Sequence, residues 1–440
     1  MSFLIKSADI YKKTQLSKIN EKILATPIGG NIGSLPTLFT KGGKFNREAN
    51  SYIFYKKVIR QAVDLQPCSQ ALQDYYQFLE DNNLHWNKFP PIKRLKPTYL
   101  FRSHLLKKIK KGTLAHSTAS IRMNQIVNYY KWLLHDGFLA VNNEKEAPFK
   151  MEFVSIKTIG ILAHISPKFI IESSDLRIKV PRDSETKTVR SLTPLSQAEL
   201  DILTDFLPEA SQELKLQILI SIDTGLRIQE VATISLNAIK SARPLAESEY
   251  RSEFSVAPQL NGVQTKYGNK RTIEISKKLL DILNEYCISE RRLKRVNKLD
   301  KKLNDFFNSK LELNEKTAIS FKRCLDHEPL FVSEQGNPVS PKSIEARWSE
   351  LRAKIKIIHP SFTHRFHDFR STYGTYRLSD LLSVGLHTTE CLELLMGWMG
   401  HKNESTTMKY IRFLKRREAF KVKFGILDSI MHHALGGEDE

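Results

Sequence analysis

A chain of 440 residues is longer than one ordinary domain, so two or three domains are expected. Lys and Arg number 68 against 48 acidic residues, a net charge of +20, and hydrophobic residues make up 41%, enough to fill real cores. The cationic excess favours a polyanionic partner, most often nucleic acid; a solvated basic surface or an anionic membrane is the alternative.

The residue pattern argues against secretion, membrane insertion and structural zinc. The apolar run within Met1–Lys6 is too short for a signal peptide, and no stretch of about 18 uncharged apolar residues occurs. The four cysteines are scattered without a Cys-x-x-Cys pair, and His432 and His433 have no cysteine or acidic cluster around them. We therefore expect a cytoplasmic protein without a metal site.

The first 66 residues are the least regular part of the chain. Glycines and prolines such as Gly29, Gly30 and Pro36 interrupt short apolar pieces. Small β-elements or an extension that packs on the next domain are expected here.

Residues 67–178 show helical periodicity. Leu72, Tyr75, Tyr76 and Leu79 recur at helical spacing, and a second stripe runs from Ile126 to Leu134 and ends at Asp136-Gly137. The aromatic residues lie on the apolar faces, so we expect them in a core. Two basic runs lie between the stripes, either as a solvated face or as phosphate contacts: Lys93, Arg94 and Lys96, then Lys107, Lys108, Lys110 and Lys111.

Residues 179–192 lack apolar periodicity and alternate in charge, which is typical of an interdomain linker. Beyond them, Ser196 and Glu199 form a Ser-x-x-Glu capping box that predicts a helix start. An apolar helix is expected over about 213–222, and it leads into Thr224-Gly225-Leu226-Arg227. Gly225 can adopt a backbone conformation closed to other residues, which helps to place Arg227.

Short strands are expected at 254–256, 263–266 and 271–275, with turn residues at 267–270. Lys266 stands just before that turn, and Lys270 and Arg271 are its near competitors for a functional role. Residues 285–325 are basic and helical, with an apolar stripe from Leu293 to Phe306; they fit an inserted helix that either packs by its stripe or faces DNA or a partner. Ser340-Pro341 opens a further helix.

The stretch from Thr363 to Tyr410 carries the richest chemistry. His367 and Arg370 are three residues apart, so a helix would place them on one face. A Gly400-His401 pair at a helix start, followed by a polar turn, could return His401 to Tyr410. Arginine binds phosphate oxygens through paired hydrogen bonds, histidine moves protons near neutral pH, and tyrosine can be a covalent nucleophile. Together they suit metal-free attack on a phosphodiester.

His367-x-x-Arg370, Gly400-His401 and Tyr410, preceded by the Asp223–Glu230 motif with its Arg227, resemble the tyrosine recombinases of the phage integrase family. The resemblance implies a mainly α fold with a small β-sheet. It implies a helical core-binding domain (67–178), a linker (179–192) and a mixed α/β catalytic domain (193–424) with a basic helical insertion at about 285–325, forming a C-shaped clamp on DNA. Residues 1–66 would be an N-terminal extension that either binds arm-type DNA sites or packs on the next domain.

The resemblance also implies a role for each site residue. Tyr410 would attack the scissile phosphate and form a 3′-phosphotyrosyl bond, while Arg227, Arg370 and His401 would stabilise the transition state. Lys266 would protonate the leaving 5′-oxygen, and His367 would assist proton transfer. Glu230 would support Arg227. Neither ATP nor a divalent metal would be needed. The sequence departs from the family at Ser371, where many members have a second histidine, and His364 is a rival for His367 that lacks an arginine three residues on.

The implied partner is double-stranded DNA with specific recombination sites, bound by a homotetramer that is a monomer or weak dimer when free. Accessory DNA-bending or directionality proteins, a nucleoid-associated location and an origin on a phage or mobile element fit the same picture. The tail, 425–440, is expected to dock on a neighbouring protomer through residues about 425–435. The alternatives are a type IB topoisomerase-like relaxase and a DNA-binding regulator. A metal nuclease is not favoured, because the sequence has no cluster of Asp, Glu and His residues to bind the metal.

Overall fold

The computed structural model describes residues 2–19, 22–62, 64–141, 143–156, 169–181, 192–246, 248–308, 315–401, 407–410 and 430–431. The chain divides into two compact units, one made of Met1–Pro181 with Leu313–Thr317 and the other of Arg182–Glu312 and Ala318–Glu440. Each unit has its own hydrophobic core, and each is described by itself below.

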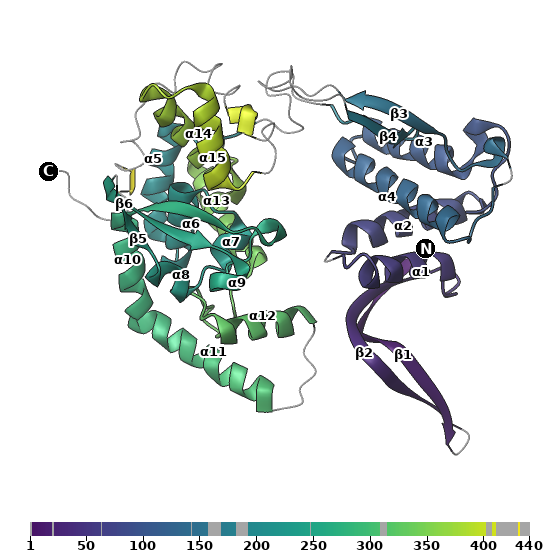
Figure 1. Ribbon diagram of the computed structural model, residues 1–440, viewed down its shortest axis with the longest axis horizontal. Helices are drawn as coiled ribbons and strands as arrows, with labels where there is room; N and C mark the ends of the chain where they lie inside the picture. The colour runs from purple at the N-terminus through teal and green to yellow at the C-terminus, as the bar shows by residue number, and fades with distance from the viewer. Residues whose placement is uncertain are drawn as a thin grey trace. The chain divides into compact units, whose positions relative to one another are not determined.

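The first unit begins with a long antiparallel ribbon of β1 (Phe3–Ile19) and β2 (Lys22–Phe39). The register pairs Phe3 with Phe39 and Ile19 with Lys22, with irregularities between Ser7 and Lys13. Figure 1 shows the ribbon extending away from the helices that follow it. Its base is fixed to helix α1 because Asn50 exchanges two hydrogen bonds with the backbone of Leu38, at 2.7 and 2.9 Å.

The helices of the first unit pack around an aromatic core. They are α1 (Arg47–Val58), α2 (Gln66–Asp81), η1 (Lys93–Leu95), α3 (Pro97–Lys110), α4 (His116–His135) and η2 (Glu144–Glu146), followed by the paired strands β3 (Met151–Ile156) and β4 (Phe169–Ser174). The hydroxyls of Tyr75 and Tyr130 lie 2.7 Å apart, as do those of Tyr76 and Tyr129, so both pairs keep their polar ends satisfied inside the core. The core placement expected for these aromatics is confirmed.

The second unit places helices around a small sheet of order β5-β6-β7. Its elements are α5 (Gln197–Phe206), η3 (Leu207–Glu209), α6 (Gln212–Thr224), α7 (Ile228–Ala232), α8 (Leu236–Lys240), β5 (Arg243–Leu245), β6 (Ser248–Val256), α9 (Pro258–Asn261), η4 (Lys266–Gly268), β7 (Arg271–Ser276), α10 (Lys277–Ile288), α11 (Glu290–Asn308), α12 (Glu315–Asp326), α13 (Pro341–Ile358), α14 (Phe366–Ser383) and α15 (Thr388–Met399). The mainly α fold with small sheets is the fold class expected from the sequence.

The strand expected at 263–266 is wrong. The chain forms the short helix α9 just before this segment, ends it at Gly262 with φ of 74°, and continues as a loop into η4, which begins at Lys266. The Asn261 side chain closes this segment on itself by donating to the Ser255 carbonyl at 2.6 Å. The backbone N–H of Gln264 donates to the Thr233 hydroxyl at 2.8 Å, so it is engaged outside any strand ladder.

The basic helix α11 is anchored in the second unit through its arginines. Arg292 is 1% exposed and donates to the carbonyls of Cys287, Pro329 and Leu330. Arg291 and Arg295 both pair with the buried carboxylate of Glu213, at 2.7 and 2.8 Å. These three cations therefore serve packing, whereas Lys294 and Lys301 of the same helix are exposed.

Two residues of the C-terminal segment, Ile430 and Met431, are buried in the core of the second unit of the same chain. The other residues of the expected docking segment, 425–429 and 432–435, lie outside the described residues. Within the described part of the chain, no helix is long and apolar enough to cross a membrane.

Candidate active site

The turn that carries Arg227 is built by the end of helix α6. Gly225 ends that helix in the left-handed conformation, with φ of 64°. A Cβ atom at this position would lie 2.3 Å from the ring of Tyr373, so glycine is required both by the backbone and by the neighbour. Asp223 fixes the turn to the sheet by accepting from Ser276 N at 2.7 Å and from Arg251 at 3.2 Å. Arg227 then starts helix α7.

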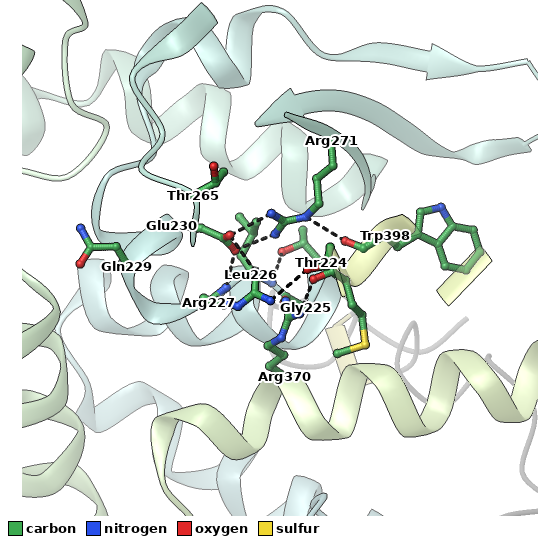
Figure 2. A network of polar contacts seen from close by, with 12 residues as sticks. Thr224, Gly225, Leu226, Arg227, Gln229, Glu230, Thr265, Arg271, Arg370 and Trp398 are labelled. Atoms are coloured by element: carbon green, nitrogen blue, oxygen red, sulfur yellow. Dashed lines mark hydrogen bonds and ion pairs between the residues drawn. The ribbon is translucent and has the colours of Figure 1, made fainter. Parts of the chain in front are cut away.

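Glu230 is the centre of a network of arginines (Figure 2). It is fully buried and accepts from the backbone N–H of Arg227 at 2.8 Å and from Arg227 Nη1 at 3.2 Å. Arg271 binds both carboxylate oxygens, at 2.8 and 2.6 Å. Burial by itself would raise the pKa of Glu230, but the hydrogen bonds and charge of Arg271 and the Arg227 backbone hold it below its ordinary value. Glu230 is therefore an ionised support for Arg227.

Helix α14 carries His367 and Arg370, as the sequence predicts. Phe366 and Phe369 pack into the core, which leaves His367 exposed. Arg370 is buried, and its guanidinium donates to the carbonyls of Gly225 and Met399. Its Nη2 atom also lies 3.2 Å from His401 Nε2. The rival residue His364 is occupied elsewhere, since its Nε2 lies 2.9 Å from the carboxylate of Glu199.

His401 follows directly on helix α15, because Gly400 ends that helix with φ of 58°. The expectation that the Gly-His pair starts a helix is therefore wrong; the pair ends one. His401 Nδ1 lies 2.9 Å from the Thr407 hydroxyl, and its ring stacks on that of Tyr410 with centroids 6.3 Å apart and planes 13° apart. The two side chains do come together; the polar residues 402–406 between them lie outside the described residues.

The site is rich in positive charge, and this charge shifts the pKa values of its residues. Burial and the cations Arg370, Lys409 and Arg227 lower the pKa of His401 to about 2, so its ring is neutral. Burial and the Arg227 cation lower the pKa of Arg370 to about 9, which still leaves the guanidinium charged at neutral pH. Desolvation by the surrounding protein, then Arg370 and Lys409, lower the pKa of His367. Crowded cations of this kind favour an incoming phosphate.

Tyr410 is 1% exposed and packs against Gly374. Burial raises its pKa to about 12, while Arg370, a hydrogen bond with Ser371 and Arg227 act in the opposite direction. Ser371, the position where the sequence departs from the family, thus contacts the candidate nucleophile. The Lys409 ammonium lies 5.0 Å from the centre of the Tyr410 ring.

The candidate lysine and its two competitors lie in different surroundings. Lys266 is exposed in η4, within the connection from β6 to β7. Lys270 is also exposed. The Arg271 side chain is only 7% exposed and is bound to Glu230, so it does not compete with Lys266 for a proton-donating role.

The basic residues proposed for DNA contact in the first unit fall into two groups. Lys96 is 6% exposed and donates to the Ala147 carbonyl at 2.6 Å, so this buried ammonium is already used by the fold and the expectation of a phosphate contact is corrected. The other six are partly or fully exposed: Lys93, Arg94, Lys107, Lys108, Lys110 and Lys111. Lys93 lies 2.6 Å from Asp175, and the later lysines cluster at the C-terminal end of α3, where the helix dipole favours cations.

Sequence reasoning missed Thr407 and Lys409, and it named Arg271 only as a competitor of Lys266. Arg271 supports Glu230, Thr407 orients His401, and Lys409 adds a cation beside Tyr410. The signal available for Thr407 was the polar run just before Tyr410, and that for Arg271 was its place directly after the Lys266 turn. Among the described residues, no cluster of His, Cys, Asp and Glu side chains is arranged to hold a metal ion.

Three solved structures of recombinases resemble this chain at low sequence identity. The XerH site-specific recombinase bound to its difH substrate in a pre-cleavage complex is 13% identical, with 80% of this chain and 78% of that chain covered and a TM-score of 0.42. The XerA recombinase is 15% identical, with 90% and 99% covered and a TM-score of 0.31. A lambda integrase dimer bound to a COC′ core site is 13% identical, with 86% and 79% covered and a TM-score of 0.44.

No curated protein matches the chain in sequence. The sequence profile of the phage integrase family, in contrast, matches residues 194–417, which span α5 through Tyr410 and include every candidate catalytic residue described above. Over that region the fold brings Arg227, Arg370, His401 and Tyr410 together. The chain belongs to the phage integrase family, the tyrosine recombinases that cut and rejoin DNA.

Proposed function

We propose that this site cleaves one DNA strand at a time by attack of Tyr410 on the scissile phosphate. The phenolic oxygen forms a bond to phosphorus, the bond to the 5′-oxygen breaks, and a 3′-phosphotyrosyl ester and a free 5′-hydroxyl result. The ester keeps the energy of the original bond, so a 5′-hydroxyl from a partner strand can reverse the step and join to a new end. No nucleotide cofactor enters this balance.

The proposal rests on one observation: Arg370, His401 and Tyr410 lie together, and Arg227 lies beside them. Arg370 lies 3.2 Å from His401, whose ring stacks on Tyr410. Arg227 donates to the carbonyl of Gly400, the residue before His401, at 3.3 Å. These side chains come from segments far apart in the sequence, and donors aimed at a charge that develops in the transition state are each worth about 10²- to 10³-fold in rate.

Lys266 and His367 are the residues proposed to transfer protons. The leaving 5′-oxygen needs a proton, which we assign to the ammonium of Lys266 in the exposed β6–β7 connection. His367, exposed beside Arg370 and with a lowered pKa, is neutral at pH 7 and can accept the phenolic proton directly or through water. Tyr410 is buried in the DNA-free chain, so attack requires its ring to turn out of the packing against Gly374.

The assembly proposed for this reaction is a homotetramer on two synapsed recombination sites in the cytoplasm. The helical part of the first unit would grip one side of the duplex as a core-binding domain, with Lys93, Arg94, Lys107, Lys108, Lys110 and Lys111 as its phosphate contacts. Residues 179–192 would be the linker between two domains. Accessory proteins would set the direction of the reaction. A single-site relaxase on the same chemistry is distinguished by asking whether two sites become joined.

A nicked suicide substrate tests the proposed function. The nick lets the short product strand diffuse away, so the covalent intermediate accumulates. In chelator, the wild-type chain should give a protein–DNA adduct that resists denaturation, and Tyr410→Phe should give none. Tyr250→Phe is the matched control, because Tyr250 is 77% exposed on β6 and has no part in the site. An adduct that persists in Tyr410→Phe, or that requires a metal, would refute the proposal.

A further inference from the structure

We infer that Arg271 is a positioning residue for strand cleavage, which holds the Arg227 motif and the His401 segment in register without itself touching the phosphate. The inference rests on the proposed function of the site. It starts from the end of helix α15, where three consecutive carbonyls each accept from a different arginine. Arg271 Nε donates to Trp398 O at 3.0 Å, Arg370 donates to Met399 O, and Arg227 donates to Gly400 O.

Carbonyls at the end of a helix have no partner within the helix, and they carry partial negative charge. Here the three guanidiniums supply the missing donors immediately before His401. The position of the imidazole is therefore set by the arginines that surround the same site. Arg271 also packs on this turn, because a Cβ atom at Gly400 would lie 3.0 Å from Arg271 Cδ.

The three arginines differ in what they have left to offer a substrate. The side chain of Arg227 is 22% exposed and that of Arg271 is 7% exposed. Arg271 places Nε, Nη1 and Nη2 on protein acceptors, namely Trp398 O and both oxygens of Glu230 (Figure 2). Arg227 can turn donors toward a phosphate, and Arg370 lies against His401, whereas Arg271 stays bound to the protein.

Arg271 also shares the carboxylate of Glu230 with Arg227. Each oxygen of this buried carboxylate accepts one hydrogen bond from Arg271 and one from Arg227. Because Arg271 shares the carboxylate, the charge of Arg227 is only partly neutralised and stays available to an anion. Without Arg271, the buried carboxylate would draw the Arg227 guanidinium toward itself, and Trp398 O would lose its donor. Both changes would misplace groups that act on the phosphate.

The test measures single-turnover cleavage at saturating DNA for wild type, Arg271→Met, Arg271→Lys and Glu230→Gln/Arg271→Met. Arg243→Met is the matched control, an exposed arginine on β5 of the same sheet. We expect Arg271→Met to bind DNA like wild type but to cleave about 100-fold more slowly, because small misplacements of catalytic groups have effects of that size. Arg271→Lys, which keeps the charge but not the forked geometry, should recover part of the rate. Arg243→Met should cleave at the wild-type rate.

A substrate with sulfur in place of the leaving 5′-oxygen separates positioning from proton donation, since a thiolate leaves without needing a proton. The sulfur substrate should restore Lys266→Ala and leave Arg271→Met about 100-fold slow. Restoration of Arg271→Met to the wild-type rate would make Arg271 a proton donor and overturn the inference.

Cleavage by Arg271→Met within about threefold of wild type on the ordinary substrate would also overturn it. If Arg271→Met does not fold, Glu230→Gln/Arg271→Met replaces it, because this double variant leaves no unpaired carboxylate buried. Its cleavage should again be about 100-fold slower than that of wild type, and the same two results would overturn the inference. Failure of the wild-type chain to form any adduct would instead refute the proposed function.

Discussion

His401 is a neutral imidazole among cations, and this makes the stability of the DNA-free protein depend on pH. Its pKa is lowered to about 2, whereas the unfolded chain binds a proton near pH 6.5. Below pH 6.5 the unfolded state therefore binds more protons than the folded state, and stability falls as pH falls. The contribution is up to about 2 kcal/mol between pH 7 and pH 5.

Chemical unfolding at the two pH values checks this, with His401→Asn as the control. The variant should lose less stability on acidification than wild type. Equal losses in the two proteins would show that His401 is protonated in the folded state at pH 5, contrary to the geometry of its contact with Arg370.

Gly374 keeps the space in which the Tyr410 ring rests. A methyl group at residue 374 would lie 2.8 Å from Tyr410 Cε1 and 2.9 Å from Met399 Sδ. Gly374→Ala should therefore drive the ring from its buried position. Nitration of tyrosines followed by peptide mapping measures the change: residue 410 should be protected in wild type and modified in the variant. Equal protection in both proteins would contradict the packing described here.

The sequence alone proposed Arg227, Glu230, His367, Arg370, His401 and Tyr410 because their types and spacing form a pattern. The contacts of Arg271 and Thr407 could not be predicted in the same way. Their role depends on which carbonyl or imidazole lies opposite, and those partners are 127 and 6 residues away in the chain. Lys96 is an error of the opposite kind, a residue that the sequence proposed for DNA contact but that the fold buries. A run of basic residues does not show which side chain is bonded to a backbone carbonyl.

At the scale of elements, helix α11 divides its cations between packing and solvent. Arg292→Met would leave the carbonyls of Cys287, Pro329 and Leu330 without this donor, so we expect a loss of about 3 kcal/mol or more in the free energy of unfolding. Lys294→Met should leave the unfolding midpoint unchanged, because Lys294 is exposed and pairs with Glu290, which is exposed as well. Denaturant unfolding of both variants decides this; similar midpoints would mean that Arg292 does not anchor the helix.

Helices with clear end signals were predictable, and irregular β-structure was not. The capping box of Ser196 and Glu199 starts α5, and Ser340 with Pro341 starts α13, both as the sequence predicts. Glycines and prolines divide the sequence of the β1–β2 ribbon into short pieces. The two strands nevertheless pair along their length, with an irregular register between Ser7 and Lys13. Residues 263–266 have strand-like alternation, but the backbone N–H of Gln264 donates to the Thr233 hydroxyl and not to a neighbouring strand.

The whole molecule carries a net charge of +20, and this predicts how its affinity for DNA depends on salt. Each phosphate contact releases condensed counterions, so a protein with several contacts loses about 10³-fold or more in affinity between 50 and 200 mM salt. Fluorescence anisotropy with a labelled duplex measures this. A salt-independent affinity would show that the cationic surface does not face the backbone of DNA.

The central claim is that residues from separated segments act on one phosphorus atom and transfer its ester to Tyr410. Digestion of the covalent adduct with protease and nuclease, followed by mass spectrometry, tests it most directly. We predict one nucleotide-bearing peptide, with the 3′-phosphate linked to residue 410 and a 5′-hydroxyl on the released strand. A link at any other residue, or a 5′-phosphate attached to the protein, would contradict the account.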